Sequence, residues 1–143
     1  MEALGKYFTL DELTASATAR RLGLSNMPLT EHVENLRQLV ACTLDPLRQL
    51  WGKPLRVNSG YRSPTLNTAV GGARNSQHCR GCAADITTLS LDANRSLLGI
   101  ILENYRTLSF DQIIAEKCDR HGCPRWIHIS YSSTGNRKEI LYR

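Results

Sequence analysis

The sequence has no long apolar run, few aromatic residues and only a modest excess of positive charge. A membrane-spanning helix needs roughly 18 or more consecutive apolar residues, and no stretch of the 143 residues approaches that length. The sequence therefore predicts no membrane span. The net charge is +5, and the Lys and Arg residues are scattered rather than gathered in a stripe. We therefore expect no nucleic-acid partner, because such binding needs a concentrated basic surface.

The first residues lack the basic start and the apolar block of a secretory signal. We therefore expect a protein that is made in the cytoplasm without a signal peptide. A substrate outside the cell would have to be reached after release or through another delivery route.

Length and composition predict a domain with a real hydrophobic core. Hydrophobic residues make up 41% of the chain and charged residues 22%, as in ordinary globular proteins. We expect a single domain over residues 1–143, with a helical N-terminal part at 1–52 and a sheet within 53–143. We also expect a monomer.

Two helices are predicted in the N-terminal part. Residues 9–12 have the pattern of a capping box, so a helix should begin at residue 10, run to about residue 21 and stop at Gly23. Apolar residues at helical spacing predict a second helix, which Thr30 caps and which continues to about residue 51. Pro46 should kink or break this helix, because proline lacks the backbone N–H.

Alternation of apolar and polar residues predicts a sheet in the second part of the chain. The predicted strands span residues 55–59, 83–87, 110–116, 126–131 and 139–142. Helices are predicted between them, a short one over 64–70 and a long one after Ser90. Helices first, followed by strands mixed with helices, favour an α+β fold with a mainly antiparallel sheet flanked by helices.

Three residues of the predicted strands and their flanking loop form a candidate metal site. His78 and Asp85 lie on either side of a glycine turn, and His128 lies on a later strand. Two imidazoles and one carboxylate would give zinc three ligands and leave its fourth position open for water. Asp85 stands in an apolar strand, where a buried carboxylate needs a partner. We interpret the other two histidines, His32 and His121, as ordinary surface or core residues.

The chain has five cysteines, four of which form two short-spaced pairs. They are Cys42, Cys79, Cys82, Cys118 and Cys123. The CxxC and CxxxxC pairs are compatible with free thiols, with a second, four-cysteine zinc site, or with disulfides. The sequence leaves these alternatives open.

Four motifs resemble those of the zinc D-Ala-D-Ala carboxypeptidase family, which has the hedgehog/DD-peptidase fold. The pattern Ser-x-His-x-x-Gly-x-Ala-x-Asp at 76–85 resembles the family signature, and residues 60–63, 110–116 and 126–131 resemble its other motifs in the same order. The N-terminal part is similar to the small phage- and prophage-associated branch of that family.

The resemblance implies a role for six residues of this chain. It implies His78, Asp85 and His128 as zinc ligands, Arg62 and Ser76 as groups that bind a substrate carboxylate, and Glu116 as the catalytic base. Many family members place the base three residues before the last histidine, where this sequence has Arg125.

The function expected from this resemblance is zinc-dependent hydrolysis of peptidoglycan stem peptides, either D-Ala-D-Ala carboxypeptidase-like or L-Ala-D-Glu endopeptidase-like. The protein would act on the cell wall after phage-like release or delivery. The main alternative is a non-catalytic zinc module on the same fold that binds cell-wall peptide or a protein partner. A second alternative is a nucleic-acid-binding module with zinc held by the four paired cysteines.

Overall fold

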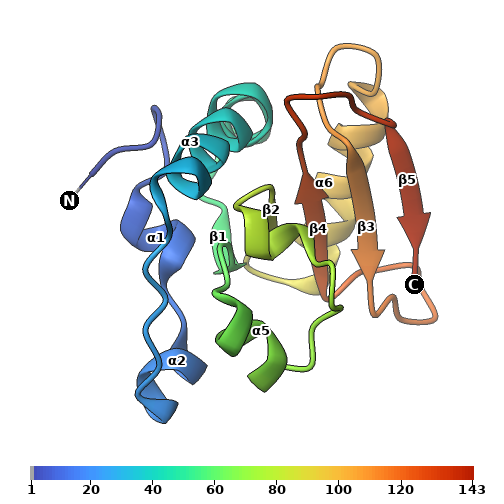
Figure 1. Ribbon diagram of the computed structural model, residues 1–143. Helices are drawn as coiled ribbons and strands as arrows, with labels where there is room; N and C mark the ends of the chain where they lie inside the picture. Colours follow the sequence, from blue (N-terminus) through green and yellow to red (C-terminus); the bar gives the residue numbers. More distant parts are fainter. Residues whose placement is uncertain (1) are drawn as a thin grey trace.

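The computed structural model describes residues 2–143 and consists of a five-stranded sheet with helices packed around it (Figure 1). The helices are α1 (Leu10–Thr14), α2 (Ala17–Leu22), α3 (Thr30–Leu39), the π-helix η1 (Val40–Leu44), α4 (Asp45–Trp51), α5 (Pro64–Ala69), the 3-10 helix η2 (Gln77–Arg80) and α6 (Leu91–Glu103). The strands are β1 (Arg56–Ser59), β2 (Ala83–Thr87), β3 (Gln112–Glu116), β4 (Trp126–Ser130) and β5 (Glu139–Tyr142).

The strands lie in the order β1-β2-β4-β3-β5. Three of the four neighbouring pairs are antiparallel, and only β5 runs parallel to its neighbour β3. The prediction of an α+β fold with a mainly antiparallel sheet is therefore confirmed. The order also makes β2 and β4 neighbours although β3 comes between them in the sequence, and this pairing positions the candidate site.

One face of the sheet forms the hydrophobic core with the helices. Its strand residues are Ala84, Ile86, Ile113, Ala115, Ile127 and Ile129, and they share one buried cluster with Leu36, Leu39, Leu44, Leu47, Leu97 and Ile101 of the helices. Side chains alternate along a strand, so the intervening residues, which include Asp85 and His128, point away from this cluster. Because the apolar strand residues face the helices, the polar residues that alternate with them lie on the opposite face of the sheet.

The prediction of one helix over residues 10–21 is wrong, because the structure has two short helices there. α1 ends at Thr14, and Ala15 is in an extended conformation. Ser16 then begins α2 as its N-cap, with its side chain accepting a hydrogen bond from the Ala19 N–H. A serine side chain can hydrogen-bond a nearby backbone N–H in place of the helical backbone bond, so a serine can interrupt a helical stretch. The predicted stop at Gly23 is correct, since that residue is left-handed with φ 66°.

Pro46 changes the helix type without ending the helix. The helical stretch from Thr30 to Trp51 continues through the π-helix η1 just before the proline. Asp45 donates its N–H to the Val40 carbonyl, five residues back, where an α-helix would use the residue four back. A π-turn is one way in which a helix accommodates an interruption of its hydrogen-bond ladder. The cap lies one residue earlier than predicted, at Leu29.

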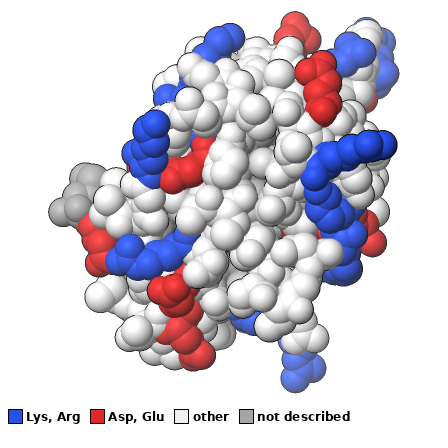
Figure 2. All heavy atoms as spheres, turned by 90° about the horizontal axis from the view of Figure 1, so that it is seen from above, with Lys and Arg blue, Asp and Glu red and all other residues white. Residues whose placement is uncertain are grey.

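The surface carries charges of both signs. On the face shown in Figure 2, basic and acidic side chains are interspersed around a central area of uncharged residues. None of the helices in the described part of the chain is both long enough and apolar enough to cross a membrane.

Candidate metal centre

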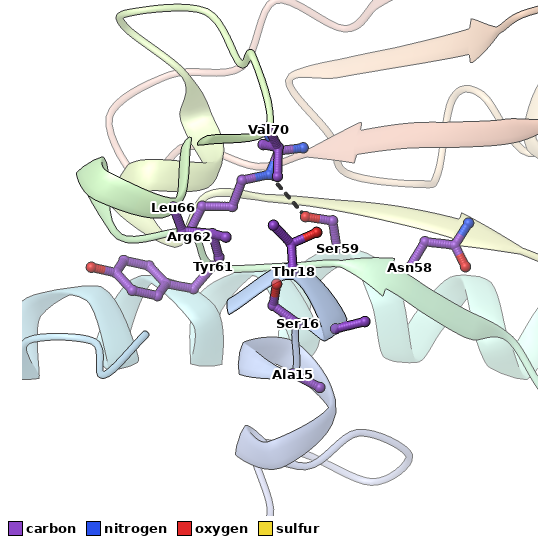
Figure 3. Close-up of a pocket in the computed structure, with 10 residues that line it drawn as sticks. Ala15, Ser16, Thr18, Asn58, Ser59, Tyr61, Arg62, Leu66 and Val70 are labelled. Atoms are coloured by element: carbon purple, nitrogen blue, oxygen red, sulfur yellow. Dashed lines mark hydrogen bonds between the residues drawn. The ribbon is translucent and has the colours of Figure 1, made fainter. Parts of the chain in front are cut away.

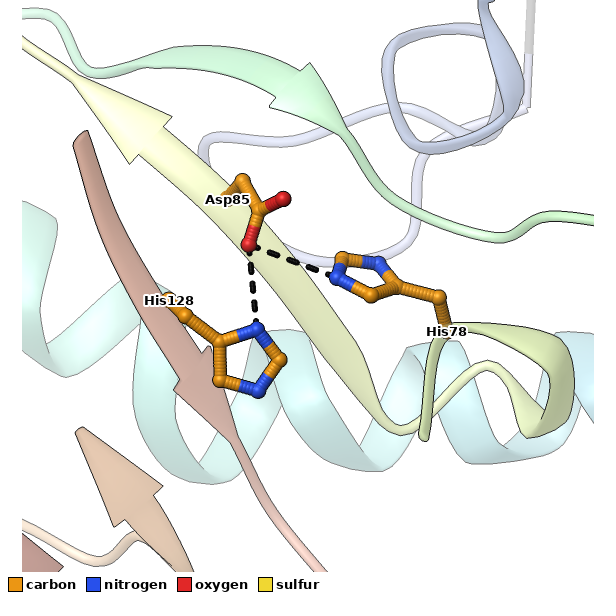
Figure 4. A group of neighbouring side chains, drawn as sticks. All are labelled: His78, Asp85 and His128. Atoms are coloured by element: carbon orange, nitrogen blue, oxygen red, sulfur yellow. Dashed lines mark hydrogen bonds and ion pairs between the residues drawn. The ribbon is translucent and has the colours of Figure 1, made fainter. Parts of the chain in front are cut away.

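His78, Asp85 and His128 come together on the polar face of the sheet (Figure 4). Their potential ligand atoms all lie within 4.8 Å of one another. Across residues 2–143 they form the only group of three or more His, Cys, Asp or Glu side chains with such spacing. His78 is 4% exposed and Asp85 is 8% exposed, so the group is largely shielded from water.

Strand pairing brings Asp85 and His128 together. The two residues are directly opposite each other in the antiparallel pair β2–β4. Such cross-strand partners have neighbouring side chains on the same face. His128 Nδ1 lies 3.0 Å from Asp85 Oδ1.

His78 reaches the site from the short helix η2 rather than from the sheet. Ser76 caps this helix, since its hydroxyl accepts a hydrogen bond from the His78 N–H at 3.2 Å. Gly81 ends it with φ 73°. A side chain at this glycine would also meet the carbonyl oxygen of His32 at 2.5 Å. The glycine in the Ser76–Asp85 motif is therefore required both by its conformation and by its close packing.

The ring orientation of His78 is fixed by the backbone of Gly60. His78 Nδ1 lies 2.7 Å from the Gly60 carbonyl oxygen. A carbonyl only accepts, so Nδ1 carries the proton and donates it. Gly60 itself packs so tightly on α1 that a Cβ there would lie 2.3 Å from the Leu13 carbonyl oxygen. The first helix thus helps to hold a glycine that in turn orients His78.

The remaining nitrogen of His78 faces an acceptor. Nε2 lies 3.3 Å from Asp85 Oδ1, and in the neutral imidazole that nitrogen carries a lone pair. Burial alone would raise the pKa of Asp85, but hydrogen bonds from His128 and His78, when each ring carries an extra proton, outweigh burial and hold the pKa well below its usual value. Two lone-pair groups facing one another require a cation or an extra proton between them. The donor set therefore fits a metal ion that accepts nitrogen and carboxylate ligands.

Arg62 binds the other side of the same carboxylate. Its Nη2 lies 3.4 Å from Asp85 Oδ2, its Nε donates to Ser59 Oγ at 2.9 Å and its Nη1 donates to Asn67 Oδ1 at 3.1 Å. These contacts hold the guanidinium beside the metal-ligand candidate. Arg62 also lines a cavity of about 280 Å³ between β1, α2 and α5, where Figure 3 shows its bond to Ser59.

A larger groove of about 560 Å³ opens beside His128. Three arginines line it, namely Arg80, Arg137 and Arg143, together with Asp111 as its one acidic residue. Arg137 and Asp111 form an ion pair of 2.8 Å. Arg80 and Arg143 are not part of this ion pair, so the side chains that line the groove carry a net positive charge.

The other two predicted site residues, Ser76 and Glu116, lie around the cluster and are both half-buried. Ser76 lines the groove, and its hydroxyl is used as the η2 cap. Glu116 is at the end of β3 opposite Trp126, two residues beyond Ile114, which pairs with His128. It therefore shares the face of His128 but lies roughly 7 Å farther along the strand. The Glu116 carbonyl accepts the Arg125 N–H at 2.9 Å, and the Arg125 side chain is exposed.

All five cysteines are free thiols. Cys79 lines a surface cavity with Arg74, whereas Cys82 lines the arginine groove. The CxxC pair is thus divided between two different surfaces. Within residues 2–143 no cysteine belongs to a cluster of potential metal ligands. Of the alternatives left open by the sequence, the structure supports free thiols, and it gives no support to a four-cysteine zinc site.

The sequence reasoning assigned no role to Gln77, Asp111, Ser59 or Asn67, which all contact the site or its partners. Gln77 lies next to the predicted ligand His78, and Asp111 lies at the start of the strand predicted over residues 110–116. Nothing in their spacing indicated that a residue of η2 would contact one that precedes β3. Only the tertiary structure reveals the contact.

Comparison with known proteins identifies the family of the chain. A family model described as Peptidase M15 matches residues 6–130. The zinc D-Ala-D-Ala carboxypeptidase of Streptomyces albus G is 52% identical over 44 residues, a match that covers 30% of this chain and 17% of that protein. The chain thus spans less than a fifth of the length of this curated relative. Because the family model covers most of the sequence, the chain belongs to the peptidase M15 family, and the family resemblance seen in the motifs is confirmed.

Proposed function

We propose that the chain is a zinc-dependent peptidase that hydrolyses peptidoglycan stem peptides, with His78, Asp85 and His128 as the metal ligands. The observation that carries the proposal is the convergence of two imidazole nitrogens on one ionised, buried carboxylate. The predicted zinc cofactor is confirmed by the family and by this three-residue cluster. When bound, zinc would polarise the carbonyl of the peptide bond to be cleaved. It would also lower the pKa of a bound water to near neutral.

Glu116 is the proposed base. Its place on the face of His128, at the end of β3, supports this role. A carboxylate there would take the proton of the attacking water and pass it to the leaving amine. Arg125 stands where many family members have the base, and a guanidinium cannot accept a proton.

Arg62 and Ser76 are the proposed binding groups for a substrate carboxylate. Arg62 has five N–H donors, and three of them are used by Ser59, Asn67 and Asp85. Two N–H groups remain for a substrate, close to the metal-ligand candidate. Ser76 lines the groove on the other side of the cluster, next to His128.

The charge of the groove supports an acidic peptide as substrate. Arg80, Arg137 and Arg143 outnumber the single carboxylate of Asp111 there. Stem peptides carry free carboxylates, which suit arginine. Both D-Ala-D-Ala and L-Ala-D-Glu linkages meet this requirement, and we propose that one of them is cleaved. We also propose a monomer that reaches the cell wall after phage-like release or delivery.

Digestion of purified muropeptides tests this function. The zinc-loaded protein should release a fragment that mass analysis assigns to one of the two linkages, and a chelator should abolish the release. His78→Ala should be inactive under the same conditions. Intact muropeptides after incubation with zinc-loaded, folded protein would contradict a peptidase function.

The second candidate is a non-catalytic zinc module that binds cell-wall peptide or a partner. The observation that favours it is Arg125 at the position where many relatives have their base. Such a module would bind muropeptides in a zinc-dependent titration and leave them uncut. Cleavage with multiple turnovers would exclude it.

A further inference from the structure

Gln77 links the candidate ligand His128 to a buried carboxylate. Gln77 Oε1 lies 3.1 Å from His128 Nε2, and Gln77 Nε2 lies 2.9 Å from Asp111 Oδ2. These contacts join residues that are 51 and 34 positions apart in the sequence.

Asp111 determines which end of the Gln77 amide faces the imidazole. Asp111 is 4% exposed, and its carboxylate accepts the Arg137 backbone N–H at 2.8 Å, its Nε–H at 3.1 Å and its Nη2–H at 2.8 Å. An ionised carboxylate is an acceptor only, so the amide must present its NH₂ group to Asp111. The amide oxygen then faces His128.

The amide oxygen in turn determines the tautomer of His128. Because an amide oxygen only accepts, Nε2 of the imidazole must carry the proton. A neutral ring that binds a metal then has its lone pair on Nδ1, the nitrogen that lies 3.0 Å from Asp85 Oδ1. His78 has the opposite arrangement, since its Nδ1 donates to Gly60 and its Nε2 faces Asp85. The two histidines would bind a metal through different nitrogens. The Gly60 carbonyl leaves Nε2 of His78 for the metal, and the Gln77 amide leaves Nδ1 of His128.

We propose that Gln77, oriented by Asp111, is a positioning residue that holds His128 as the Nε2–H tautomer and so presents Nδ1 to the metal. The effect on the metal rests on the proposed zinc site. Without a metal, the Asp85 carboxylate at 3.0 Å competes for a proton on His128 Nδ1, so the tautomer is tested in the zinc-loaded protein. Partners outside the ligand set commonly fix the tautomer and orientation of a ligating imidazole, and their loss typically lowers metal affinity about 10- to 100-fold.

Imidazole ¹⁵N NMR of the zinc-loaded protein tests the tautomer directly. Wild-type His128 should appear as the Nε2–H form. Gln77→Leu removes the acceptor at similar side-chain size, so the Nε2–H signal should lose its hydrogen-bond shift and zinc affinity should fall about 10- to 100-fold. Asp111→Asn leaves Gln77 in place but allows its amide to turn, so zinc affinity should also fall.

Gln112→Leu is the matched control. Gln112 lines the same groove, but its amide donates to Glu139 rather than to His128. This variant should leave both the His128 tautomer and the zinc affinity unchanged.

Wild-type His128 in the Nδ1–H form would overturn the proposal, whether or not the variants fold. So would a folded Gln77→Leu protein with unchanged tautomer and unchanged zinc affinity. Zinc affinity that depends on Gln77 in a protein without peptidase activity would leave the inference standing and contradict the proposed function alone.

Discussion

Arg62 Nη2 lies 3.4 Å from Asp85 Oδ2, whereas Oδ1 of the same carboxylate faces the two histidines. The carboxylate is thus held from both sides, by a cation on one oxygen and by the two imidazoles on the other. This arrangement gives Arg62 a part in shaping the candidate metal site as well as its proposed part in binding substrate.

Arg62→Lys should weaken zinc binding by about tenfold. Lysine has a single ammonium group and cannot keep the separate bonds to Ser59, Asn67 and Asp85, so Asp85 loses a partner that orients it. Competition with a metal-binding fluorophore measures the change. Arg56→Lys, at an exposed position of β1, serves as the control and should have no effect. Unchanged zinc affinity in folded Arg62→Lys would show that Arg62 does not contribute to metal binding and would leave only its proposed role in substrate binding.

His78→Ala should abolish stoichiometric zinc binding, because it removes one of three converging ligands. In the wild type, zinc at about 1,000 times its dissociation constant should stabilise the fold by about 4 kcal/mol. For a domain of this size that is an increase in melting temperature of roughly 10 °C. Thermal denaturation with and without zinc, together with elemental analysis, checks both points.

The exposed His121 provides the control for that experiment, and His121→Ala should bind one zinc ion per chain like the wild type. Replacing Cys79, Cys82, Cys118 and Cys123 together by serine should also leave one zinc ion per chain. A second zinc ion that disappears with these cysteines would contradict the assignment of free thiols.

Glu116→Gln should keep zinc and lower kcat by about 10²- to 10⁴-fold, the usual contribution of a general base. The amide has nearly the size of the carboxylate but does not take up a proton. Steady-state hydrolysis of muropeptides and elemental analysis of the same sample separate catalysis from metal loss. Glu103→Gln, at an exposed position on α6, is the control. Full activity in Glu116→Gln would remove Glu116 as the base.

Asp111 should make the fold sensitive to acid. Hydrogen bonds with Arg137 hold the pKa of Asp111 below its usual value, and an unfolded aspartate has a pKa of about 3.9. A depressed pKa stabilises the fold above the unfolded pKa, and this stabilisation is lost as the pH falls through the folded pKa. The loss is therefore expected below about pH 4.

Asp111→Asn isolates this contribution. At neutral pH the variant should be less stable by about 2 kcal/mol, because hydrogen bonds to a charged group are replaced by weaker ones. Below about pH 4 the difference from the wild type should shrink, because the wild-type carboxylate is also becoming neutral. Melting temperatures of both proteins between pH 6 and pH 2.5 measure this. A difference that stays constant down to pH 2.5 would show that the charge of Asp111 contributes little.

Arg80→Gln should raise KM about two- to fivefold for acidic stem peptides and leave KM unchanged for the same peptides with amidated carboxylates. Arg80 lines the groove beside His128, and an exposed charge pair contributes about 0.2–1 kcal/mol. Raising the salt concentration should weaken wild-type binding in the same way. Equal KM values for acidic and amidated peptides in the wild type would argue against a carboxylate contact in the groove.

Local sequence patterns determined the elements of this protein and the faces of its strands. The strand Ala83–Thr87 has the predicted bounds, and Asp85 lies on the face opposite to Ala84 and Ile86 as the alternation of side chains requires. The capping box at Thr9 and the stop at Gly23 are also where the pattern put them. Such features depend on residues a few positions apart, so the sequence contains all the information they need.

The tertiary structure alone decided which elements become neighbours. The alternation of side chains indicates the face of Asp85 but not the strand beside it, and the pairing of β2 with β4 brings in His128 from 43 residues away. The parallel placement of β5 and the contact of Gln77 with Asp111 were likewise not predictable from spacing. Contacts between distant residues arise because burial of the apolar face selects one packing of the elements, and that selection depends on the whole chain at once.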